Sequence, residues 1–243
     1  GLPPIRLYDY QPSRGGYHAE EFLKGFSGYL TCDGFGGYNK LKDVTRCGCL
    51  AHMRRYWYDA LPGKSKKSPD KTPAEIGFDY CNQLFELEKE YADLDADTRK
   101  ARRLETEPAI WEAYWSWLET VDPAGGSRLA KAVTYAKNQK PYMENYLLDG
   151  RCSISNNIAE NIARPYAVGR KNFLFHDTVK GARASSIIYS LAETAKLNNL
   201  NIYAYLETVL LYMPDYKNEP EGIEELMPWS DMIQQRCRIR SKS

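Results

Sequence analysis

Asp33 stands in a setting where a carboxylate often does chemistry. It follows the short segment 28–32, which has the pattern of a buried strand, and it precedes a glycine-rich turn. In α/β proteins, functional groups concentrate where a strand ends. The plainer interpretation is that Asp33 and Gly34 only make a turn, for which this dipeptide is well suited. The local pattern leaves both interpretations open.

Glu160 is the second acidic candidate, and its neighbours have helical spacing. Ile158 and Ile162 lie four residues apart and define the expected buried face, whereas Asn157, Glu160 and Arg164 share a different face. A carboxylate flanked by amides, with an arginine one turn later, could hold a metal ion and a phosphate. The alternative is a solvated polar face.

The cysteines suggest a reduced compartment. Six are present, at positions 32, 47, 49, 81, 152 and 237, without the spacing of a disulfide framework. Cys49-x-x-His52, with Cys47 nearby, could supply zinc ligands, but no second ligand pair follows at zinc-finger spacing. A packed histidine at position 52 is the competing interpretation.

Composition and charge exclude several classes of protein. The chain has 243 residues, 43% of them hydrophobic, which is typical of a soluble globular protein. No apolar run is long enough to cross a bilayer, and the first residues do not resemble a signal peptide. The net charge of +1 does not by itself indicate nucleic-acid binding. Basic residues cluster locally, at 54–55, 64–71, 99–103, 164–171 and 236–242.

Apolar periodicity predicts the elements that position these residues. In the first quarter of the chain we expect strands at 5–10, 28–32 and 44–50 and helices at 18–26 and 51–60, followed by an exposed linker at 62–73.

The middle and last parts of the chain have longer helical patterns. We expect helices at 75–93, 97–121 and 128–139, packed as a small bundle of their own around Trp111, Trp115 and Trp117. Pro165 should end a helix over 155–164, and 167–175 should be extended. Helices at 180–198 and 202–212 follow, and beyond Pro214 we expect a mobile tail.

Five ordered motifs resemble transposases of the insertion sequence 66 family. They are YLTCDGFGGYN at 29–39, CLAHMRR at 49–55, NNIAEN at 156–161, GRKNFLF at 169–175 and YSLAETAKLN at 189–198. YQPSR at 10–14, AYLE at 204–207 and MPW at 227–229 fit the same family. The resemblance runs from about residue 5 to residue 229.

The resemblance implies an α/β fold with a ribonuclease H-like mixed sheet. Residues 1–62 would be the α/β part with the second catalytic aspartate, 63–150 an α-helical insertion, 151–214 the helical part with the catalytic glutamate, and 215–243 a C-terminal tail. The first strands and the first aspartate would lie upstream of Gly1. The start at Gly-Leu-Pro-Pro, without a methionine, is what we expect of an excised piece.

The same resemblance implies the chemistry. Asp33 and Glu160 would be the second and third catalytic acids and would bind metal, with two Mg²⁺ (or Mn²⁺) ions in the complete site. Such a site cleaves DNA and transfers strands by two-metal phosphodiester chemistry. The implied setting is the bacterial cytoplasm, with DNA as partner, a homo-oligomer in the active complex and no membrane.

Without the first aspartate the chain should be inactive alone. The alternative function is a non-catalytic DNA-binding or assembly module from a truncated or decayed transposase.

Further residues are expected to support the site. Arg54, Arg55, Arg164, Arg170 and Lys171 could contact phosphates, and surface ion pairs are the alternative. Asn156 and Asn157 could orient Glu160 or cap the start of its helix, and capping is the expected role of Asn156.

Overall fold

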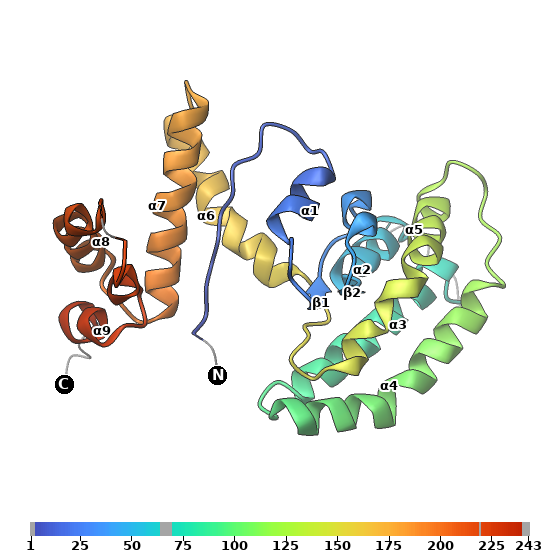
Figure 1. The fold of residues 1–243 in the computed structure, drawn as a ribbon. Coiled ribbons are helices and arrows are strands. Elements are labelled where there is room, and N and C mark those ends of the chain that lie inside the picture. Colours follow the sequence, from blue (N-terminus) through green and yellow to red (C-terminus); the bar gives the residue numbers. More distant parts are fainter. Residues whose placement is uncertain (1–2, 64–69, 219, 240–243) are drawn as a thin grey trace. The chain divides into compact units, whose positions relative to one another are not determined.

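The computed structural model describes residues 3–63, 70–218 and 220–239 (Figure 1). The chain is mixed α/β and mostly helical. It divides into two compact units. The larger unit is Gly15–Ile158, and the terminal unit combines Gly1–Arg14 with Ala159–Ser243. No helix within the described ranges is long and apolar enough to cross a membrane.

The larger unit begins with α1 (Tyr17–Phe22) and a two-stranded parallel sheet of β1 (Gly28–Thr31) and β2 (Val44–Cys47). Gly28 pairs with Val44 and Thr31 with Cys47. Parallel strands need a crossover connection, and here it contains the short 3-10 helix η1 (Gly36–Lys40). Both strands therefore end at the same edge, where Asp33 follows β1.

Four helices complete the larger unit: α2 (Leu50–Asp59), α3 (Pro73–Glu90), α4 (Ala96–Leu118) and α5 (Arg128–Met143). Side chains cap three of them. Thr72 forms a capping box with Glu75 before α3, Asp95 caps α4 and Ser127 caps α5. The 3-10 helix η2 (Asn145–Leu148) follows α5.

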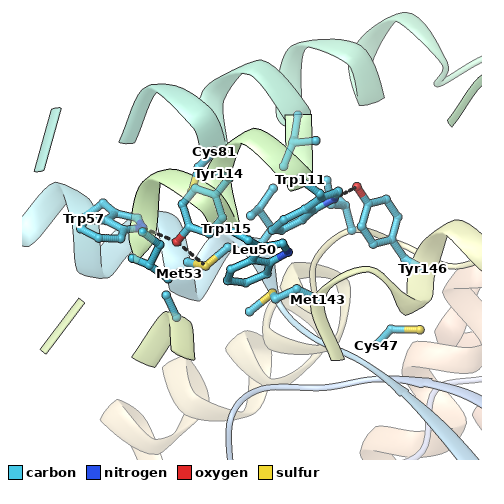
Figure 2. Packing of buried hydrophobic residues seen from close by; sticks show 14 of the residues in the cluster. Cys47, Leu50, Met53, Trp57, Cys81, Trp111, Tyr114, Trp115, Met143 and Tyr146 are labelled. Atoms are coloured by element: carbon cyan, nitrogen blue, oxygen red, sulfur yellow. Dashed lines mark hydrogen bonds between the residues drawn. The ribbon is translucent and has the colours of Figure 1, made fainter. Parts of the chain in front are cut away.

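The core of the larger unit is rich in aromatic side chains (Figure 2). The hydroxyl of Tyr114 accepts a hydrogen bond from Trp57 Nε1 at 3.1 Å and donates one to Met53 Sδ at 3.2 Å. Since Met53 and Trp57 belong to α2, the helices α3–α5 share their core with α2. The prediction that these helices form a separate bundle is therefore wrong. The tryptophans at 111 and 115 are buried core residues.

The terminal unit contains α6 (Asn157–Phe173), of which the first two residues belong to the larger unit, α7 (Val179–Leu197) and α8 (Ile202–Tyr212). The 3-10 helices η3 (Met213–Tyr216) and η4 (Ile223–Leu226) and the helix α9 (Asp231–Cys237) follow. The expected helices at 180–198 and 202–212 are confirmed. Thr178 and Asn201 cap α7 and α8 with their side chains.

The prediction of a strand at 5–10 is wrong, because this segment pairs with a helix. Arg6 N–H donates to Thr194 Oγ1 at 3.1 Å, and Tyr8 N–H donates to Ser190 Oγ at 2.8 Å. Two extended residues span about 6.6 Å, close to the roughly 6 Å rise of four helical residues. Every second residue therefore contacts a successive turn of α7. This pairing explains the alternation of apolar and polar residues at 5–10 without a neighbouring strand.

The helix that we expected to end at Pro165 continues to Phe173. The prediction of an extended segment at 167–175 is therefore wrong. Pro165 removes one backbone donor, but the following turns pack on α7. The ring of Tyr166 lies 5.0 Å from that of Tyr189. A Cβ atom at Gly169 would approach the Tyr189 hydroxyl to 2.7 Å, so glycine permits this close packing. Packing of α6 on α7 outweighs the missing hydrogen bond.

The tail beyond Pro214 has more order than expected. Ile233 and Cys237 of α9 are buried in a core with Leu200, Tyr205 and Val209. Ser230 caps α9 through its hydroxyl group. The helix α9 was not predicted, because it is short and contributes few buried residues to a recognisable apolar pattern. Residues 240–243, part of the basic cluster at the end of the chain, lie outside the described residues.

Candidate active site

Asp33 lies at the carboxyl end of β1, as the sequence indicates. Its Oδ1 atom accepts a hydrogen bond from the backbone N–H of Phe35 at 3.0 Å, which fixes the turn. Oδ2 has no hydrogen-bond partner among the described residues. The half-buried carboxylate therefore keeps one oxygen for another ligand.

Helix α5 approaches the turn after Asp33. A Cβ atom at Gly34 would lie 3.0 Å from the ring of Tyr135 and 3.2 Å from the side-chain amide of Gln139. Burial raises the pKa of Tyr135, and Cys49, Tyr56 and Asp33 raise it further. The Tyr135 hydroxyl is buried without a hydrogen-bond partner among the described residues. Tyr135 is thus a neutral polar group beside the Asp33 turn.

Tyr135 and Gln139 were not among the residues predicted for the site. They lie about 100 residues after Asp33 in an amphipathic helix, and nothing in their local pattern separates them from ordinary helix residues. Only the packing of α5 on the turn identifies them.

Arg46 supplies a buried positive charge near the same turn. It lies opposite Leu30 in the sheet, and its guanidinium carbon is 4.0 Å from the centre of the Tyr142 ring. It also donates to the side-chain oxygen of Asn39. Burial raises the pKa of Cys32, and a hydrogen bond with Arg46 opposes that rise. Arg46 was not among the predicted site residues, because its role depends on burial.

The cysteines are buried free thiols, including Cys32, which directly precedes Asp33, and the zinc candidate Cys49. Cys49 Sγ accepts a hydrogen bond from Asn156 N–H at 3.4 Å. Within the described part of the chain, no group of three or more His, Cys, Asp or Glu side chains is arranged to hold a metal ion. Cys49 is thus a buried thiol whose sulfur accepts a backbone hydrogen bond.

The amides before Glu160 have different environments. Asn156 Oδ1 is buried and makes no hydrogen bond among the described residues, so the cap expected from Asn156 is not formed. Asn157 is the exposed first residue of α6. The prediction that Ile158 lies on the buried face of this helix is also wrong, because Ile158 is 65% exposed.

Glu160 lies in the first turn of α6 and is exposed. A carboxylate there is favoured by the positive end of the helix dipole. Arg164 and Lys171 follow Glu160 by four and eleven residues. Since α6 is continuous through Pro165, they lie on the same face as Glu160. Both are exposed. The side chain of Arg170 lies outside the described residues.

Arg54 and Arg55 lie on α2 in the larger unit. Arg54 Nε donates to Asn82 Oδ1 at 2.6 Å, and its guanidinium carbon lies 4.6 Å from the centre of the Phe78 ring. Arg55 is exposed. Asp33 is in the larger unit and Glu160 is in the terminal unit.

Comparison with known protein families identifies the chain. The sequence profile described as "Transposase IS66 family" matches residues 1–184, and that described as "IS66 C-terminal element" matches residues 190–229. The chain belongs to the IS66 transposase family. The resemblance noted in the motifs is confirmed along nearly the whole chain.

Curated relatives of this IS66 family chain come from Sinorhizobium fredii. It is 32% identical over 241 residues to "Uncharacterized protein y4qI", covering 94% of this chain and 43% of the relative. It is 30% identical over 239 residues to "Uncharacterized protein y4jD", covering 94% and 46%. The chain therefore spans less than half the length of these relatives. No solved structure matches this IS66 family sequence.

Proposed function

We propose that this chain is part of the catalytic domain of a transposase that cleaves DNA and transfers its strands. The observation that carries this proposal is the match of both IS66 family profiles to one chain, residues 1–184 and 190–229. The full activity belongs to a longer protein, since the chain spans less than half of its curated relatives.

The proposed fold is ribonuclease H-like. In this proposal β1 and β2 belong to a larger mixed sheet, to which strands outside the chain contribute. Among the described residues β1 has β2 as its strand partner, so its other edge can accept another strand. Residues 63–150 are proposed as the insertion and 151–214 as the part with the last catalytic residue, with 1–62 before them and the C-terminal 215–243 after them.

Asp33 and Glu160 are proposed as two of three catalytic acids. Asp33 fits a metal ligand because Oδ2 has no hydrogen bond within the described residues, and hard cations such as Mg²⁺ prefer carboxylate oxygen. Two bound Mg²⁺ or Mn²⁺ ions would supply activation of the attacking oxygen and stabilisation of the leaving oxygen. Asp33 and Glu160 would hold and orient those ions, and a third carboxylate would come from outside this chain.

The basic residues are proposed to hold DNA. Arg164 and Lys171 share the face of α6 with Glu160 and can bind phosphates of a strand that lies along this face. Arg54, Arg55 and Arg170 are proposed as further phosphate contacts. Phosphate contacts position the strand and carry no sequence information. A homo-oligomer in the bacterial cytoplasm is the proposed setting.

Substitutions in the full-length transposase test this function. We expect Asp33→Asn and Glu160→Gln each to reduce cleavage of DNA with the element end to background in Mg²⁺, while the variants still bind DNA. Glu112→Gln, at an exposed position of α4, is the matched control and should stay active. Full activity in either site variant would refute the assignment.

The isolated chain tests the missing third carboxylate. We expect no cleavage when it is incubated with Mg²⁺ or Mn²⁺ and the same DNA. Specific cleavage that Asp33→Asn abolishes would show that another acid, such as Asp9, completes the site. If the full-length protein binds DNA but never cleaves it, the alternative of a non-catalytic binding or assembly module is correct.

A further inference from the structure

A pocket of about 520 Å³ lies between α2 and α3 in the larger unit. Its volume is within the roughly 300–1,000 Å³ of typical small-ligand sites. Its wall combines aromatic rings, cations and amides, among them Arg54, Arg55, Tyr58, Phe78, Asn82 and Lys89. The proposed function uses the two arginines only as general phosphate contacts and does not explain the pocket.

The aromatic wall of the pocket offers a ring face to a ligand. Tyr58 is 60% exposed although it lies on a helix with a well-packed opposite face. Its ring centre is 5.8 Å from that of Phe78, which is half-buried. An exposed ring braced by a second ring is the arrangement on which an unpaired base can stack.

Arg54 is held in place before any ligand arrives. Its Nε atom donates to Asn82 Oδ1 at 2.6 Å, and its guanidinium lies over Phe78 at 4.6 Å and Phe85 at 5.7 Å. Among the described residues its two terminal nitrogens have no hydrogen-bond partner. A guanidinium fixed in this way can bind a phosphate through its free edge with little loss of side-chain entropy.

The remaining charges of the pocket also favour an anion. Arg55 and Lys89 are exposed on the rim, and the acid in the lining, Glu86, pairs with Lys89 at 2.6 Å. Positive charges therefore outnumber negative ones. Asn157, the first residue of the helix that carries Glu160, also lines the pocket and exposes an amide.

We propose that this pocket binds one unpaired nucleotide of a DNA strand, with the base on Tyr58 and the phosphate at Arg54 and Arg55. This inference rests on the proposed function, in which DNA is the substrate. The nucleotide must be unpaired, because a base inside a duplex has both faces covered and cannot stack on Tyr58. A strand end or an opened base pair lowers the cost of unstacking.

Binding to two DNA molecules that differ only in a single-stranded overhang tests the pocket. The unsubstituted chain should bind the duplex with an overhang roughly 10-fold more tightly than the blunt duplex, because stacking of one base on an aromatic side chain contributes about 1–3 kcal/mol. An overhang base replaced by 2-aminopurine should lose fluorescence on binding. Both effects are measured at one fixed salt concentration.

Three variants in the pocket and one control outside it connect these effects to the pocket. Tyr58→Leu should bring the affinity ratio close to one and abolish the fluorescence loss, whereas Tyr58→Phe, which keeps the ring, should retain both. Tyr203→Leu is the matched control, because Tyr203 is also an exposed helical tyrosine, 76% exposed, but lies on α8. Arg54→Gln should reduce the ratio as well, and circular dichroism checks that each variant is folded.

The possible outcomes separate this inference from the proposed function. Equal affinity for both DNA molecules, or a preference that Tyr58→Leu leaves intact, overturns the pocket assignment while DNA binding stands. No binding of this chain to either DNA overturns the pocket assignment, and no DNA binding by the full-length transposase refutes the proposed function as well. A free deoxynucleoside monophosphate that competes as strongly as the overhang would show a site for free nucleotides, which also overturns the inference.

Discussion

At the scale of single residues, Arg103 connects α4 to the segment before α6. Its side chain is 1% exposed, and it binds both carboxylate oxygens of Glu88 at 2.7 and 2.6 Å. The same guanidinium donates to the backbone carbonyls of Tyr146, Asp149 and Cys152. One buried cation thus satisfies a carboxylate and three carbonyl groups.

We predict that Arg103→Met lowers the free energy of unfolding by about 3–5 kcal/mol, because it leaves Glu88 with an unpaired, largely buried charge. The neighbouring Arg102 pairs with Glu105 at the surface and is 51% exposed, so Arg102→Met should change stability by roughly 0–1 kcal/mol. Urea denaturation followed by tryptophan fluorescence measures both. Equal effects of the two variants would contradict the buried role of Arg103.

Glu107 is a fully buried acid whose charge opposes folding. Tyr146 donates a hydrogen bond to its Oε2 atom, but Oε1 has no partner among the described residues. The pKa of Glu107 is raised to about 7, chiefly by burial and also by the charge of Glu88, although the hydrogen bond from Tyr146 and the charge of Arg103 oppose the rise. Between the ordinary carboxyl pKa and about 7, the folded state therefore holds more protons than the unfolded state.

The sign of the pH dependence follows from this difference. Stability contributed by protonated Glu107 is present at low pH and is lost as the pH rises towards about 7. We predict that Glu107→Gln removes this loss and makes the protein more stable than the unsubstituted chain at pH 8, by about 1–3 kcal/mol. Thermal unfolding between pH 5 and pH 8 measures it, and Glu112→Gln, at an exposed position, should leave the profile unchanged.

At the scale of elements, α9 completes the core of the terminal unit although it has only seven residues. Ile233 is fully buried there, and the Tyr205 hydroxyl donates to the carbonyl of Leu226 at 3.1 Å. Backbone bonds also join this end to α7 and α8, since Asn201 N–H donates to the carbonyl of Cys237 at 2.8 Å. The C-terminal region therefore stabilises the helix pair.

We predict that Ile233→Ala destabilises the terminal unit by about 2–5 kcal/mol, because it leaves a cavity between α8 and α9. Hydrogen exchange in α7, α8 and α9 should accelerate together, as expected of one cooperative unit. Ile239→Ala is the control, since Ile239 is 59% exposed and should not change exchange in these helices. Faster exchange confined to α9 would show that the helix is only attached to the surface.

At the scale of the whole molecule, a net charge of +1 conceals an uneven distribution. Arg164 and Lys171 are exposed on one face of α6, and Arg55 is exposed on α2. Phosphate contacts made by such groups release counterions, so DNA affinity should fall steeply as salt rises. The binding should not depend on DNA sequence, because these contacts do not read bases.

We predict that Arg164→Gln and Lys171→Gln each weaken DNA binding and each reduce the slope of log affinity against log salt by about 1. Lys137→Gln is the control, because Lys137 lies on α5 and pairs with Glu119 at 3.3 Å. Fluorescence anisotropy with duplexes of unrelated sequence measures both quantities. Affinity that stays constant between low and moderate salt would exclude phosphate contacts as the source of binding.

The elements of this protein were largely predictable from sequence, because their signals are local. Apolar spacing marked α3, α4, α7 and α8, and the turn after β1 marked Asp33. The candidate site was only partly predictable. The motifs identified the family and suggested Asp33 and Glu160 as candidate acids, but Tyr135 and Arg46 gave no local sign of their place beside Asp33.

The errors have a common physical cause. The rule that helices end near a proline predicted the end of α6 at Pro165. Packing of Tyr166 and Gly169 against Tyr189 instead stabilises the helix beyond that residue. Alternation at 5–10 predicted a strand, yet the hydroxyl groups of α7 bind that backbone. The sequence by itself determined family, helical content and candidate acids, since these depend on residue type and spacing. Only the tertiary structure decided where α6 ends, how the first residues are held and which side chains surround Asp33, because those outcomes depend on contacts between residues far apart in the chain.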